Sequence, residues 1–76
     1  MPSMQQRYYD MLMERVRNDR YPSGQLLNRI EAAIFSSEQM VEYMDMLLEK
    51  TDDAWYPSGE LLDRIERLLR LASVAA

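Results

Sequence analysis

The side chains that most often carry chemistry are scarce in this 76-residue chain, which contains no cysteine and no histidine. Disulfides, thiol nucleophiles, the usual zinc sites and the commonest general base at neutral pH are therefore excluded. Acidic groups remain, because 13 aspartates and glutamates outnumber 9 lysines and arginines and give a net charge of -4. This composition predicts a protein that is not an enzyme and that binds no cofactor.

Nine of the 13 acidic side chains lie in residues 36–76. Four of them follow one another at i+3 and i+4 spacing, on one face of a predicted helix: Glu38, Glu42, Asp45 and Glu49. Like charges at this spacing repel one another, so the face favours a basic partner protein. The same charge repels a phosphate backbone, so nucleic acid is not an expected partner.

The acidic composition and the helical layout also resemble a calmodulin lobe, which has paired EF-hands. An EF-hand loop needs oxygen ligands at its first, third and fifth positions and a glutamate at its twelfth. Counting from Asn18 puts Arg20 at the third position, and counting from Asp52 puts Ala54 there. A calcium- or ligand-responsive small regulator without EF-hand loops is thus the alternative to a protein-binding module.

Aromatic and methionine side chains supply a second candidate surface. Tyr9 and Met13 are one turn apart on the flank of the first predicted helix, and Trp55 with Tyr56 occupies a turn between helices. Such residues are typical of binding hot spots when they lie on a rim. We therefore predict a protein-binding edge made of these four residues, which binds another protein or a second copy of the chain in a homodimer.

Both surfaces depend on a tandem repeat. The segment Tyr-Pro-Ser-Gly occupies residues 21–24 and returns at 56–59, and about half of the positions are identical when 8–34 is aligned with 43–69. A repeat of about 35 residues has the length of one helical hairpin. We assign repeat one to about 3–35 and repeat two to about 36–73, within a single domain covering 1–76.

Capping signals and apolar spacing place four helices on this repeat. Ser3, Ser23, Ser36 and Ser58 stand where N-caps are expected, and Pro22 with Leu27 has the spacing of a hydrophobic staple. The predicted buried stripe of the first helix is Met4, Tyr8, Met11, Leu12 and Val16. One hairpin cannot bury its own apolar stripe, so the prediction is an all-α fold: a compact four-helix bundle made of two tandem helical hairpins, with approximate internal two-fold symmetry.

The tandem Tyr-Pro-Ser turn, at residues 21–23 and 56–58, resembles that of short uncharacterised bacterial helical proteins. The resemblance covers most of the chain and implies no activity. No apolar run approaches the length of about 18 residues that a membrane span needs, and residues 3–7 are polar where a signal peptide would turn apolar. We therefore expect a cytoplasmic protein that does not bind membranes.

Overall fold

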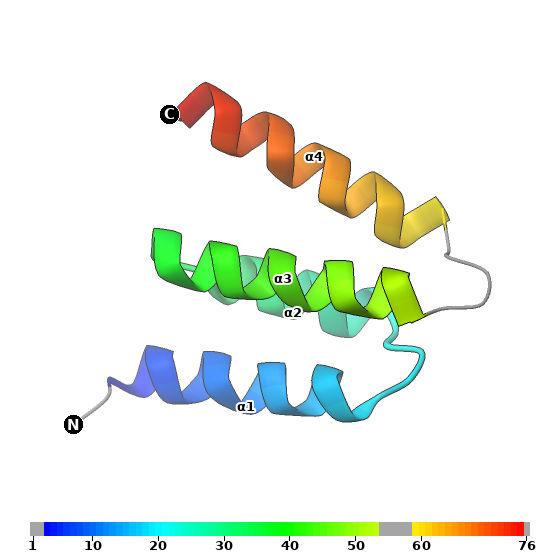
Figure 1. Ribbon diagram of the computed structural model, residues 1–76. Coiled ribbons are helices and arrows are strands. Elements are labelled where there is room, and N and C mark those ends of the chain that lie inside the picture. Colours follow the sequence, from blue (N-terminus) through cyan, green and yellow to red (C-terminus); the bar gives the residue numbers. More distant parts are fainter. Residues whose placement is uncertain (1–2, 54–58, 76) are drawn as a thin grey trace. The chain divides into compact units, whose positions relative to one another are not determined.

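The described residues of the chain form four helices (Figure 1). The computed structural model describes residues 3–53 and 59–75, with side chains as far as 71. The helices are α1 (Met4–Asn18), α2 (Gly24–Ala33), α3 (Ser37–Asp53) and α4 (Gly59–Ala75). The predicted all-α class and the two successive helical hairpins are confirmed.

The chain divides into two compact units, residues 1–40 and 41–76. The first unit contains α1, α2 and the first turn of α3, and the second contains the rest of α3 together with α4. The division falls within α3, a few residues beyond the end of the first sequence repeat, because the first turn of α3 is hydrogen-bonded to α1.

Serine side chains start three of the helices, as their spacing predicts. The hydroxyl of Ser3 accepts a hydrogen bond from the Gln6 amide at 3.1 Å, and that of Ser23 accepts one from the Leu26 amide at 3.2 Å. Ser36 caps α3 in the same way, because its hydroxyl accepts a hydrogen bond from the Gln39 amide at 3.1 Å. Ser58 lies outside the described residues. Each cap satisfies one of the amides that a helix start leaves without a partner, and so fixes where the helix begins.

The core of the first unit is formed between α1 and α2. Its fully or nearly fully buried apolar side chains are Tyr9, Leu12, Met13 and Val16 on α1 and Leu27 and Ile30 on α2. In the second unit the buried apolar side chains are Tyr43, Met46 and Leu47 on α3 and Ile65 and Leu68 on α4.

The two sequence repeats bury some equivalent positions, such as Leu12 and Leu47, but not others. Tyr8 aligns with Tyr43 in the repeat, yet Tyr8 is 44% exposed whereas Tyr43 is 0% exposed. On α1 it is the next residue, Tyr9, that is buried. One residue corresponds to a rotation of about 100° around a helix axis. The buried side of α1 is therefore shifted by one residue from the side that the aligned positions of α3 bury. The predicted burial of Met4, Tyr8 and Met11 is wrong.

Candidate protein-binding surface

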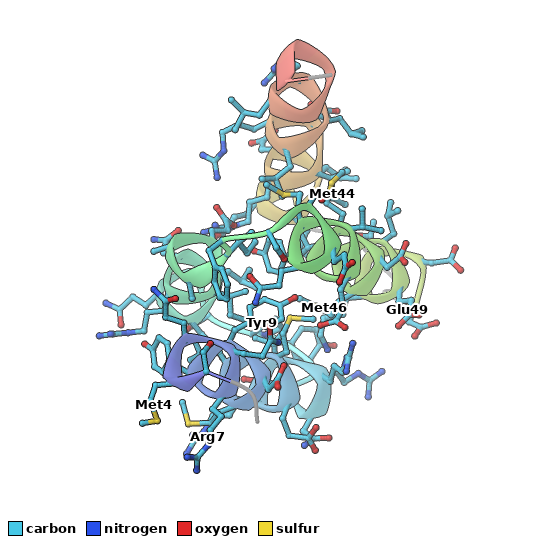
Figure 2. All side chains as sticks on the ribbon, turned by 90° about the vertical axis from the view of Figure 1, so that its left-hand side faces the viewer. Met4, Arg7, Tyr9, Met44, Met46 and Glu49 are labelled. Atoms are coloured by element: carbon cyan, nitrogen blue, oxygen red, sulfur yellow. The ribbon has the colours of Figure 1, made fainter. Side chains whose placement is uncertain are left out.

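The outer face of α3 carries the four acidic residues that the sequence places on one helix face. Glu38, Glu42, Asp45 and Glu49 are all exposed, and Figure 2 shows Glu49 pointing away from the ribbon of α3. They are exposed because the buried residues of α3, Tyr43, Met46 and Leu47, lie on a different side of the helix. The predicted acidic face therefore exists, while its role in binding a partner stays a prediction.

Two aliphatic side chains interrupt this acidic face. Val41 is 60% exposed and Leu48 is 50% exposed. They are seven residues apart, so they stand two turns from each other along one line of the helix, with Asp45 between them and Asp52 beyond. We name the set formed by Glu38, Val41, Glu42, Asp45, Leu48, Glu49 and Asp52 the acidic α3 face. It combines charge with exposed apolar area.

The structure places Tyr9 and Met13 in the core, so the prediction that they lie on an exposed edge is wrong. Tyr9 is 0% exposed and Met13 is 2% exposed. The Tyr9 hydroxyl donates a hydrogen bond to the backbone carbonyl of Gln39 at 3.0 Å, which satisfies its polar end inside the unit. The cause is the orientation of α1 about its axis. Tyr9 and Met13 lie on the same side of the helix as Val16, and that side is buried, whereas Tyr8 lies on the same side as the exposed Arg15. Trp55 and Tyr56, the other two residues of the predicted edge, lie outside the described residues.

Gln39, a buried polar residue in the first turn of α3, forms a junction between α3 and α1. Its side-chain amide donates to the Gln6 side-chain oxygen at 2.9 Å, and its side-chain oxygen accepts from the Phe35 amide at 2.8 Å. Its backbone meets Ser36 and Tyr9 as described above. A buried polar side chain with its groups satisfied holds one geometry, so this junction fixes the start of α3 against α1.

The outward side of α1 is the surface that sequence reasoning missed. Met4 is 74% exposed and Met11 is 49% exposed, and Tyr8 lies between them. Arg7 and Arg15 are exposed on the same side, and the Arg7 guanidinium lies 3.7 Å from the Met4 sulfur. Figure 2 shows Met4 and Arg7 on the side of α1 that faces away from Tyr9. We name these five residues the outer α1 stripe.

In the part of the chain that the structure describes, neither a metal centre nor a membrane span emerges from the geometry. Within residues 3–53 and 59–75, no group of three or more acidic side chains is placed to hold a metal ion. In the same stretches no helix is both long enough and apolar enough to cross a membrane. Comparison with protein-family models, curated proteins and solved structures finds no match to this chain. The resemblance to bacterial proteins with a tandem Tyr-Pro-Ser hairpin therefore stays a prediction.

Proposed function

We propose that this protein is a non-catalytic interaction module whose acidic α3 face binds a basic, amphipathic helix of a partner protein. The observation that carries the proposal is the exposure of Val41 and Leu48 within a line of carboxylates. Carboxylates alone are typical of any solvated helix. When a partner covers the aliphatic side chains exposed among them, the free energy of the complex falls by about 25 cal/mol per Å² of apolar surface buried.

The two kinds of side chain have different tasks in this proposal. The carboxylates attract and orient a cationic partner over a distance limited by screening to about 10 Å at 0.1 M salt. Val41 and Leu48 provide the short-range contact that holds the partner once it has arrived. Binding should therefore require a helix with arginine or lysine beside an apolar stripe, and a purely basic peptide should bind less tightly.

A synthetic amphipathic helix of leucine and arginine is the probe that tests this assignment by isothermal titration calorimetry. We expect saturable binding that weakens as salt rises, and loss of most of the affinity in the variant Val41→Ser/Leu48→Ser. The matched control is Leu71→Ser, because Leu71 is similarly exposed but lies on α4. Equal affinity of the first variant and the unchanged protein would refute the proposal, as would equal binding of a peptide in which glutamate replaces arginine.

A further inference from the structure

Apolar residues cover more of α1 than one neighbouring helix can bury. One line of them, through Tyr9, Met13 and Val16, is used inside the first unit. The outer α1 stripe forms a second line on the other side of the helix, and its apolar members remain exposed. Methionine and tyrosine side chains in a continuous line, unlike single exposed residues, mark a surface that packs against something.

The spacing of the stripe identifies the kind of surface that it fits. Met4, Tyr8, Met11 and Arg15 follow one another at intervals of four, three and four residues. This is the alternation that lets two helices pack along a common seam. The acidic α3 face repeats it through Val41, Asp45, Leu48 and Asp52. Two exposed helix faces of one chain thus carry the same spacing.

Their charges are complementary. On the outer α1 stripe, Arg15 stands in the seam and Arg7 stands beside it. On the acidic α3 face the corresponding seam positions are the carboxylates of Asp45 and Asp52. Packing α1 against another α1 would offer Arg15 no carboxylate within the seam, and packing α3 against another α3 would bring carboxylates together. The mixed pairing joins Arg15 to a carboxylate within the seam while covering the apolar residues of both faces.

We infer that the partner of the acidic α3 face is a second copy of this chain, docked through its outer α1 stripe. The inference rests on the proposed function, since it names the basic amphipathic helix which that function requires. A stable protein interface buries about 800 Å² on each partner, more than a single pair of helix faces supplies. The association is therefore weak and depends on salt, with a dissociation constant in the micromolar range or above.

A charge-swap experiment tests the pairing without assuming its register. One variant reverses the stripe, Arg7→Glu/Arg15→Glu, and the other reverses the α3 face, Asp45→Arg/Glu49→Arg. All four positions are exposed, and circular dichroism checks that helicity is unchanged. Sedimentation equilibrium should show each variant associating at least about tenfold more weakly than the unchanged protein, which corresponds to a loss of about 1.4 kcal/mol. An equimolar mixture of the two should recover the association, because each reversed face then meets its opposite.

The control variant Arg17→Glu/Arg29→Glu makes the same change in net charge at exposed positions off the stripe, and it should associate like the unchanged protein. An unchanged protein that is monomeric at every concentration would overturn the inference. Failure of the mixture to recover association would do so too. Undiminished association of the α3 reversal would also overturn it, because packing of α1 against α1 leaves that reversal without effect. A third outcome separates this inference from the proposed function. If the stripe reversal leaves self-association intact while the α3 reversal abolishes binding of the peptide, the proposed function stands and this inference falls.

Discussion

Two adjacent tyrosines of α1 have opposite surroundings, which makes them a matched pair for measuring a single hydrogen bond. Tyr9 is fully buried and donates its hydroxyl proton to the Gln39 carbonyl, whereas Tyr8 is partly exposed on the outer stripe. Replacing Tyr9 with phenylalanine should lower the free energy of unfolding by about 1 kcal/mol, since a buried hydrogen bond is lost without a change of shape. The same replacement at Tyr8 should change it by less than about 0.5 kcal/mol. Urea denaturation of both variants makes the comparison, and equal effects would show that the hydroxyl of Tyr9 contributes nothing.

At the scale of the helix, the rotation of α1 relative to the repeat is open to a direct test with methionines. Met11 and Met46 occupy equivalent positions in the two repeats, yet Met11 is half-exposed and Met46 is buried. Met46→Ala should cost about 2 to 5 kcal/mol, because it removes buried atoms and leaves a cavity. Met11→Ala should be nearly neutral, since it removes little packing and alanine has the higher helix propensity.

Met13 provides the control for this comparison, because it is a buried methionine on the same helix as Met11. Met13→Ala should resemble Met46→Ala in its urea midpoint, and should differ from Met11→Ala. If Met11→Ala were instead as destabilising as Met46→Ala, the two repeats would bury equivalent faces and the rotation would be refuted.

The helix starts were predictable from the sequence, whereas the face that each helix buries was only partly so. A cap is a local interaction, and Ser3, Ser23 and Ser36 each show it in the serine-to-third-residue spacing alone. On α1, two apolar lines overlap at Leu12, and the sequence does not say which line meets α2. Met4, Tyr8 and Met11 have the same four- and three-residue spacing as Tyr9, Met13 and Val16, and the spacing alone led to the wrong line.

The acidic face was the part of the site best predicted from the sequence. Charged side chains on α3 stay in solvent wherever the opposite side of the helix packs, so their spacing was sufficient to predict exposure. Val41 and Leu48 were not predicted as surface residues, because apolar residues by themselves indicate burial. Their exposure depends on which side of α3 faces the interior of its unit, and tertiary contacts decide that.

For the molecule as a whole, the excess of acid predicts a weak attraction for cations that does not select between them. A net charge of -4 raises the local concentration of any divalent ion near the acidic α3 face. Selective calcium binding needs about six to eight oxygen ligands in one place, whereas magnesium demands a smaller octahedral site. The carboxylates of the α3 face instead lie along a line, and the described residues contain no chelating group.

Calcium and magnesium at equal concentration and ionic strength should therefore raise the thermal unfolding midpoint by the same small amount. Partial neutralisation of the face in the variant Asp45→Asn/Glu49→Gln should reduce both effects together, because screening of like charges is their common cause. A differential scanning calorimetry series with each ion measures this. A midpoint that rises with calcium but not with magnesium, and saturates, would demand a chelating site and favour the calcium-responsive regulator over the interaction module. Equal responses would instead leave the α3 carboxylates as a face whose specificity comes from the apolar residues between them.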